Sequence, residues 1–150
     1  MTKSHFKSQK LRNGFLLLPQ YCVGGEQLKP NKGVRISQCM IVKNEEANIE
    51  KALSWGKSVM WEQIVVDTGS TDRTVELAKK LGAKVFFFDW IDDFAAAKNY
   101  AIEKAKGNWI AFFDADEYMV FQDANDMKGL LEGLAPNSFD AISTGCQNLD

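Results

Sequence analysis

This sequence of 150 residues contains a single histidine and no closely spaced pair of cysteines. The one histidine, His5, lies in the polar N-terminus, which argues against imidazole metal sites and against catalytic triads that depend on histidine. Cys22, Cys39 and Cys146 are odd in number, far apart and without a CxxC pair. They therefore indicate reduced thiols rather than a disulfide framework or a zinc site.

The sequence also lacks a long apolar run and a strong net charge. Nothing approaches the roughly 20 apolar residues of a membrane span. The short run at residues 15–18 has neither the length of a secretory core nor a cleavage site after it. A net charge of -2 gives no reason to expect nucleic acid or an anionic membrane surface as a partner. We therefore expect a soluble, cytoplasmic protein, and a hydrophobic content of 45% is ordinary for a single globular domain.

The most informative stretch is WIAFFDADEYM, residues 109–119. Its unbroken apolar run at residues 109–113 predicts a fully buried strand. Asp114, Asp116 and Glu117 follow at once, and alternate residues of an extended chain project the same way, so Asp114 and Asp116 can address one ligand. Hard oxygen donors without a nearby histidine or thiol suit Mg²⁺ or Mn²⁺. The alternative is a solvated turn after a core strand.

The remaining elements predict an α/β protein. Residues 1–33 show no clear period and are expected to form an N-terminal extension to a domain at 34–150. Further strands are expected at 34–42, 63–66, 85–88 and 139–144, and helices after the first two of these strands and at 94–106 and 126–134. This alternation implies a Rossmann-like, mainly parallel sheet with helices on both faces.

Polar residues follow several of these strands. Asn44 is a plausible N-cap of the first helix, and Glu45 and Glu46 suit its positive start at least as well as they suit a ligand. Ser70 or Thr71 would cap the second helix, which should end at Gly82. In these roles the residues would stabilise the helix ends rather than contact a ligand.

Two further residues are candidates for a ligand site. Asp67 ends its strand in the same register as Asp114, which favours a shared site over a turn or capping role. Lys98 lies near the first turns of the third helix, where a lysine is more often solvated than functional. The expected buried face of that helix is Phe94, Ala97, Ala101 and Ala105.

Acidic residues at the carboxyl edge of a parallel sheet mark the crevice where such folds bind nucleotides. The sequence contains neither GxGxxG after the first strand nor GxxxxGK[ST], which argues against dinucleotide binding and P-loop chemistry. A phosphate ligand held through a metal ion fits better, with Lys98 adding positive charge. A nucleoside diphosphate that carries a transferable group meets this description, because a divalent ion stabilises the leaving diphosphate.

Four motifs, KNEE, VVDTGSTDRT, DDFAAAKNYA and FFDADEYM, resemble the family 2 glycosyltransferases with their GT-A fold. The closest likeness is to the branch of lipooligosaccharide core glucosyltransferases and bacteriocin S-glycosyltransferases, and it covers residues 34–120. Each motif alone is weak, but four in order are specific. The resemblance implies a nucleotide-sugar donor, usually UDP-linked. It also implies inverting transfer to an unknown acceptor, which could be a glycan, a lipid-linked glycan or a peptide.

The resemblance also implies roles for single residues. Asp116 would coordinate the metal that bridges the diphosphate, and Asp114 would bind the ribose or assist the metal. Asp67 and its turn would hold the nucleoside, and Lys98 would lie close to the base or the diphosphate. The full donor-binding set implied is Ile41, Lys43, Glu45, Asp67, Thr68, Lys98, Asp114, Ala115 and Asp116.

Two positions depart from the family pattern. At the position of Thr68, many members carry a second aspartate, which helps to recognise uracil. The branch named above has a serine or threonine at this position. Many also carry a tyrosine where this chain has Lys43. Both departures weaken the assignment of uracil as the base.

Inverting transfer needs a carboxylate base, which this family supplies from a segment well beyond its DxD motif. Glu117 could act as a base on chemical grounds but would crowd the metal. We therefore expect the base to be missing from this chain, which would be the donor-binding, N-terminal part of a longer enzyme. A non-catalytic nucleotide-sugar-binding module and, less well supported, a sugar nucleotidyltransferase are the alternatives. A homodimer that buries the edge near residues 139–150 is left open.

Overall fold

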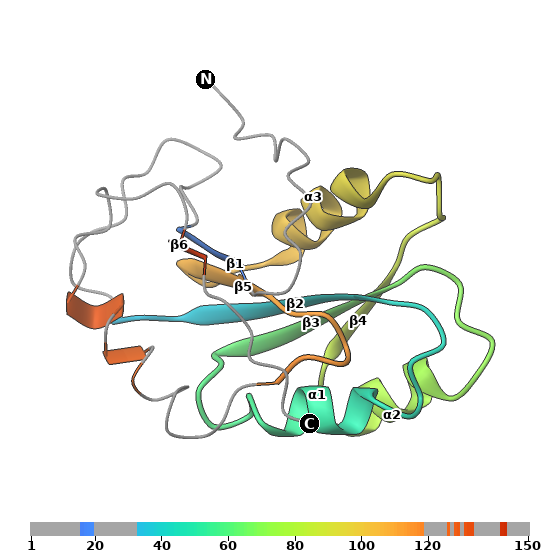
Figure 1. Cartoon of the computed structure of the whole chain (residues 1–150), viewed down its shortest axis with the longest axis horizontal. Coiled ribbons are helices and arrows are strands. Elements are labelled where there is room, and N and C mark those ends of the chain that lie inside the picture. Colours follow the sequence, from blue (N-terminus) through green and yellow to red (C-terminus); the bar gives the residue numbers. More distant parts are fainter. Residues whose placement is uncertain are drawn as a thin grey trace.

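A computed structural model describes residues 16–19, 33–118, 126, 128–129, 131–133 and 142–143. Its strands form one sheet in the order β4-β3-β2-β5-β1-β6 (Figure 1). β2, β3, β4 and β5 are parallel, whereas β1 is antiparallel to both of its neighbours, β5 and β6. The strands are β1 (Leu16–Pro19), β2 (Ile36–Val42), β3 (Glu62–Asp67), β4 (Lys84–Phe87), β5 (Trp109–Phe112) and β6 (Ile142–Ser143).

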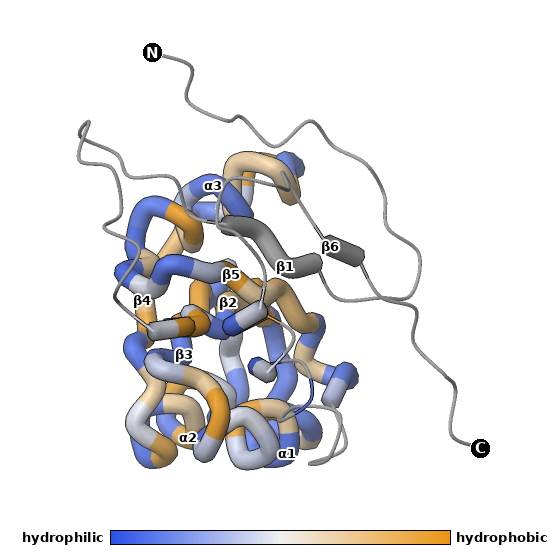
Figure 2. Tube along the Cα trace, turned by 90° about the vertical axis from the view of Figure 1, so that its left-hand side faces the viewer, coloured by the Kyte–Doolittle hydropathy of each residue, from blue (hydrophilic) through white to orange (hydrophobic). Residues whose placement is uncertain are grey.

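Helices cover both faces of this sheet. α1 (Ile49–Ser54) and α2 (Thr74–Lys80) lie on one face, and α3 (Phe94–Lys104) lies on the other (Figures 1 and 2). The prediction of a Rossmann-like, mainly parallel sheet with helices on both faces is confirmed. Within the described residues, no helix is long and apolar enough to cross a membrane.

The core is divided by the sheet into two halves. Trp109 and Ala111 of β5 pack on the side of α1 and α2, whereas Ile110 and Phe112 pack on the side of α3. Burial on both faces explains why the sequence of β5 is apolar without alternation. Cys39 of β2 is a buried free cysteine on the α3 side, and burial, followed by the charge of Glu62, raises the pKa of its thiol.

Helix α3 differs from its predicted form. It ends at Lys104, two residues before the expected end, although Ala97, Ala101 and Ala105 are buried as predicted. The prediction that Phe94 is buried is wrong, because its side chain is 66% exposed. The ring of Phe94 instead packs edge-on against Trp90, with 4.6 Å between centroids, in the loop that precedes the helix.

The other elements follow the predicted order. α2 ends before Gly82, whose φ of 87° suits a glycine at a helix terminus. The described residues between 126 and 133 are helical, and β6 lies within the range predicted for the last strand. β1 was not predicted; it lies in the expected extension and pairs with β5 from Leu16–Phe112 to Pro19–Trp109. Most residues on either side of β1 lie outside the described part of the chain.

A buried carboxylate organises the amino edge of the sheet. Glu62, at the start of β3, accepts hydrogen bonds from the Ser37 hydroxyl (2.6 Å), the Lys84 ammonium (2.6 Å) and the Lys106 backbone N–H (2.6 Å). The Ser37 hydroxyl also accepts a bond from the Gly107 N–H at 2.8 Å. The connection from α3 into β5 is thereby fixed against β2 and β3. Burial alone would raise the pKa of Glu62, but these hydrogen bonds and the charge of Lys84 outweigh it and lower that pKa.

Candidate functional site

The carboxyl edge of the sheet brings the predicted acidic residues together. β2 lies between β3 and β5, with Val42 opposite Asp67 and Cys39 opposite Phe112. The Phe113 N–H donates to the Cys39 carbonyl at 3.1 Å, so β5 leaves the sheet close to the end of β2. The backbones of Asp67 and Asp114 therefore flank β2 at two strand spacings, roughly 10 Å apart.

The turn after β5 presents its two aspartates outward. Asp114 and Asp116 are exposed, while Ala115 between them is buried. Two hydrogen bonds between Asp114 and Glu117 close the turn. The Asp114 N–H donates to a Glu117 carboxylate oxygen at 2.9 Å, and the Glu117 N–H donates to the Asp114 carbonyl at 3.0 Å. Neither Asp114 nor Asp116 has a side-chain hydrogen-bond partner within the described residues. Both carboxylates are therefore available to a ligand.

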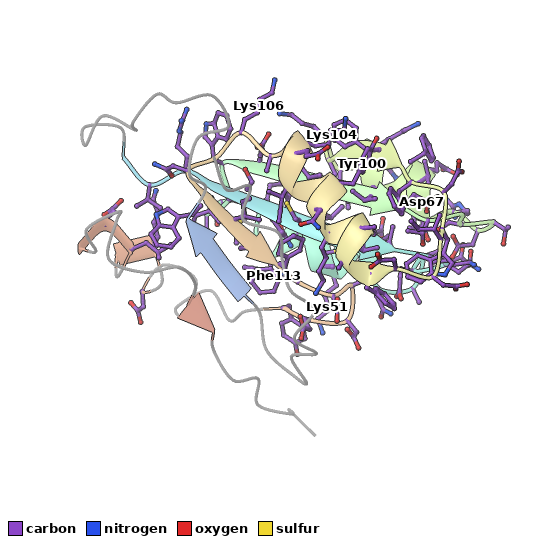
Figure 3. All side chains as sticks on the ribbon, turned by 90° about the horizontal axis from the view of Figure 1, so that it is seen from above. Lys51, Asp67, Tyr100, Lys104, Lys106 and Phe113 are labelled. Atoms are coloured by element: carbon purple, nitrogen blue, oxygen red, sulfur yellow. The ribbon has the colours of Figure 1, made fainter. Side chains whose placement is uncertain are left out.

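Aromatic contacts hold this turn against α1. The Trp55 ring packs edge-on against Phe113 with 4.8 Å between centroids, and the Lys51 ammonium lies 3.8 Å from the centroid of Tyr118. Lys51 and Phe113 are labelled in Figure 3. These contacts were not predicted, although the aromatic residues on both sides of the carboxylates were a signal for them. They fix the backbone on both sides of Asp114 and Asp116.

The basic residues of the predicted site lie on two elements. Lys98 of α3 is half-buried, and its ammonium lies 5.5 Å from the ring centroid of Phe112, two residues before Asp114. Lys43 is exposed directly after β2, and Ile41 before it is half-buried in the core on the α3 side. Positive charge and the exposed carboxylates thus occur at the same edge, as a metal–diphosphate ligand would require.

Asp67 is held differently from Asp114 and Asp116. It is 3% exposed, lies at the end of the sheet opposite to Lys106 (Figure 3), and accepts hydrogen bonds from the N–H groups of Gly69 and Ser70, each at 3.1 Å. Its carboxylate organises its own turn and retains acceptor capacity, since a carboxylate has about four lone-pair sites. The neighbouring Thr68 is buried and donates its hydroxyl proton to the Val42 carbonyl at 3.1 Å.

The predicted capping roles in the adjacent loops are wrong. Asn44 lies five residues before α1 and has a φ of 56°, and its side chain accepts a hydrogen bond from the Thr71 N–H instead of capping α1. Ser70 and Thr71 do not cap α2, because Asp72 accepts from the Thr74 N–H at 3.0 Å. Asn44 instead bonds Ser70 and Thr71 of the opposite loop, a contact that a local sequence pattern cannot reveal.

Glu45 also has structural contacts. Its N–H donates to the Thr74 hydroxyl at 2.7 Å, and its carboxylate accepts from the Asn48 amide at 2.9 Å. The first of these bonds links the segment before α1 to the start of α2. A structural role for Glu45 was the alternative to ligand contact, and these bonds provide one.

The residues around Asp114 and Asp116 can hold a divalent ion only together with its ligand. Within the described residues, no three acidic, histidine or cysteine side chains come together as a metal site. Mg²⁺ and similar divalent ions are commonly bound by one or two carboxylates and complete their shell with phosphate oxygens and water, so the donor set fits such an ion.

A hollow of about 390 Å³ lies between α1 and α2. It contains no residue of the predicted donor-binding set and is lined by Glu46, Ala47, Glu50, Arg73, Leu77 and Lys80.

Several proteins with sequences similar to this chain are named glycosyltransferases, and another is named a TPR repeat-containing protein. The chain is 42% identical over 98 residues to a TPR repeat-containing protein of Synechococcus elongatus, covering 65% of this chain and 24% of that protein. It is 45% identical over 83 residues to an uncharacterized glycosyltransferase of Rickettsia bellii, covering 55% and 28%. It is 40% identical over 79 residues to the prophage-derived glycosyltransferase SunS of Bacillus subtilis, covering 51% and 19%. The chain thus spans about a quarter of the length of the first two relatives.

Solved structures of similar fold are sugar-transferring enzymes. Glucosyl-3-phosphoglycerate synthase of Mycobacterium tuberculosis, in complex with Mn²⁺, UDP and glucosyl-3-phosphoglycerate, is 28% identical with a TM-score of 0.50, covering 55% of this chain and 34% of that one. A mannosyltransferase of Pyrobaculum calidifontis in complex with GDP-mannose and Mn²⁺ is 24% identical with a TM-score of 0.54, covering 69% and 34%. The second likeness shows the fold alone.

A sequence model of glycosyl transferase family 2 matches residues 37–139, which is more than half of the chain. The match includes β2 from its second residue, β3 with Asp67 at its end, β4, Lys98 of α3, and β5 with the two aspartates after it. The resemblance seen in the four sequence motifs is confirmed, and the chain belongs to glycosyltransferase family 2.

Proposed function

We propose that this chain binds the nucleotide-sugar donor of a metal-dependent glycosyltransferase, and that the donor is a UDP-sugar. One observation carries the proposal: in a chain of family 2, the buried strand β5 is followed by the exposed carboxylates of Asp114 and Asp116, and Lys98 of α3 lies over Phe112 at the end of that strand. The complex of the M. tuberculosis relative with Mn²⁺ and UDP supports the choice of ion and nucleotide.

The roles of the residues follow from their placement. Asp116, assisted by Asp114, would hold Mn²⁺ or Mg²⁺, and Lys98 would add positive charge near the diphosphate. The turn of Asp67 and Thr68 would border the nucleoside. The bound ion would supply Lewis-acid stabilisation of the diphosphate as the bond to the sugar breaks.

Transfer itself belongs to the whole enzyme. We propose that the sugar passes to the acceptor with inversion, and that the carboxylate base and most acceptor contacts come from residues outside this chain. The chain by itself would then bind donor without transferring sugar.

The test is calorimetric titration of UDP and of GDP, each with and without Mn²⁺, into the wild type, Asp116→Ala and Glu103→Ala. Glu103 is an exposed acidic residue of α3 outside the predicted site and serves as the matched control. We expect Mn²⁺-dependent binding of UDP that Asp116→Ala weakens about 100-fold, or about 2.7 kcal/mol, and that Glu103→Ala leaves unchanged. Binding of UDP that is equally tight without Mn²⁺, or in Asp116→Ala, would contradict the metal role. Preference for GDP would contradict the assignment of the base.

A further inference from the structure

The loop after β2 and the loop after β3 are joined by side chains that bond the backbone of the opposite loop. We call residues 43–48 and 68–73 the laced loops. At their tip, the Asn44 N–H donates to the Ser70 hydroxyl at 2.9 Å, and the Thr71 N–H donates to the Asn44 side-chain oxygen at 2.8 Å. Each loop therefore satisfies a backbone donor of the other.

Acidic residues form a second pair of hydrogen bonds of this kind, two residues further along each loop. The Glu46 N–H donates to the Asp72 carboxylate at 3.1 Å, and the Arg73 N–H donates to the Glu46 carboxylate at 3.0 Å. The buried Thr74 hydroxyl donates to Asp72 at 2.6 Å and accepts from the Glu45 N–H at 2.7 Å. The two loops are thus connected at several points along their length.

Ser70 connects the laced loops to the predicted nucleoside end of the site. Its N–H donates to the Asp67 carboxylate, and its hydroxyl accepts from the Asn44 N–H. The turn from Asp67 to Ser70 is therefore held by Asp67 from within and by Asn44 from the neighbouring loop. Asn44 achieves this with a φ of 56°, a left-handed conformation that asparagine tolerates better than most residues.

We propose that Asn44 is a positioning residue of the donor site, which fixes the turn of Asp67 and Thr68 without contacting the donor. The inference rests on the proposed function and goes beyond it, because Asn44 is outside the predicted donor-binding set. Without the Asn44 side chain, the turn loses the acceptor of the Thr71 N–H. The donor must then order the turn as it binds, which lowers its affinity.

Two substitutions separate this role from a direct contact. Asn44→Gly can adopt the left-handed backbone conformation of this position but removes the acceptor of the Thr71 N–H. Asn44→Asp keeps an acceptor oxygen and a residue type that tolerates this conformation, but it removes the amide N–H₂ group. A direct contact through that amide would be lost in both variants, whereas a positioning role is lost only in Asn44→Gly.

The experiment is titration of UDP with Mn²⁺ into the wild type, Asn44→Gly, Asn44→Asp and Arg73→Ala. Arg73→Ala is the matched control, because it removes the exposed Arg73–Glu76 ion pair and keeps the backbone bond from Arg73 to Glu46. We expect affinity to fall about tenfold in Asn44→Gly and to stay within about twofold of the wild type in the other two variants. Wild-type affinity in Asn44→Gly, or equal losses in Asn44→Gly and Asn44→Asp, would overturn the inference.

Amide hydrogen exchange of the nucleotide-free protein provides a second measurement. Exchange at Gly69, Ser70 and Thr71 should be faster in Asn44→Gly than in the wild type, while exchange in β5 should be unchanged. If the wild type binds neither UDP nor GDP, the proposed function fails, and the exchange data still decide whether Asn44 holds the turn. Unchanged exchange at these three amides would overturn the positioning role by itself.

Discussion

The two edges of the sheet hold their carboxylates in opposite ways. Glu62 at the amino edge is 8% exposed and is bonded by Ser37, Lys84 and the backbone of Lys106. Asp114 and Asp116 at the carboxyl edge are exposed and have no side-chain partner within the described residues. A carboxylate whose acceptor capacity is used inside the protein stabilises the fold. Exposed carboxylates at the end of a rigid, buried strand are instead available for an external cation or ligand.

Asp67 combines the two conditions. It is as buried as Glu62, but its bonds to Gly69 and Ser70 are short-range and use only part of its acceptor capacity. The nucleoside end of the proposed site is therefore built before a ligand arrives. The proposed metal end would be completed only by the ligand.

The largest expected effect comes from Gly107 at the amino edge. A Cβ there would lie 2.5 Å from the Arg35 carbonyl oxygen and 2.6 Å from the Ser37 hydroxyl, so backbone would have to move. We expect Gly107→Ala to lower the free energy of unfolding by about 3 kcal/mol. Urea unfolding measures this loss, with Gly33→Ala as the control because nothing lies within 4 Å of its Cβ position. Equal stability of the two variants would contradict the close packing at this edge.

Glu62→Gln should have a smaller, pH-dependent effect. It removes the charge that pairs with Lys84, and we expect a loss of about 1–2 kcal/mol at pH 7, because Lys84 is half-exposed and screened. The folded pKa of Glu62 lies below its ordinary value of 4.5. The stabilisation is therefore complete above pH 4.5 and disappears as the pH falls through the folded pKa.

Urea unfolding of the wild type and Glu62→Gln from pH 7 down to acid checks this prediction. The difference between the two proteins should be constant at neutral pH and should narrow below pH 4.5. A difference that persists in acid would mean that hydrogen-bond geometry, rather than the charge of Glu62, provides the stabilisation.

Asp114→Asn should have the smallest effect on stability. Its side chain is exposed without a partner in the described residues, so we expect a change within about 0.5 kcal/mol. Asp67→Asn is the comparison, because it weakens the acceptor of the Gly69 and Ser70 N–H groups, and we expect it to cost about 1 kcal/mol. Thermal unfolding distinguishes the two, and equal losses would remove the contrast between the two kinds of carboxylate.

The sequence predicted those features that depend on local patterns. The apolar run before Asp114 indicated a buried strand, and the polar residues after neighbouring strands indicated a shared edge. Both inferences need only periodicity and the rule that parallel strands end together. Roles within the donor-binding set remain predictions, because they depend on a bound ligand.

Features formed between distant segments were missed. Asn44 was assigned to capping because its partners, Ser70 and Thr71, lie in another loop. Phe94 was placed in the core because helical spacing does not show that its ring packs against Trp90 of the preceding loop and stays exposed. β1 was missed because its four residues are too few to establish a period.

The position of β1 has a consequence for how the domain is assembled. Pro19 pairs with Trp109 and Leu16 with Phe112, so β5 is flanked by a strand from near the beginning of the chain. Closing so long a loop costs only about 0.6 kcal/mol more for each doubling of its length, but pairings of high sequence separation slow folding. During synthesis, β1 emerges well before its partner exists. β1 therefore stays without this partner until β5, the strand that precedes Asp114 and Asp116, has also been made.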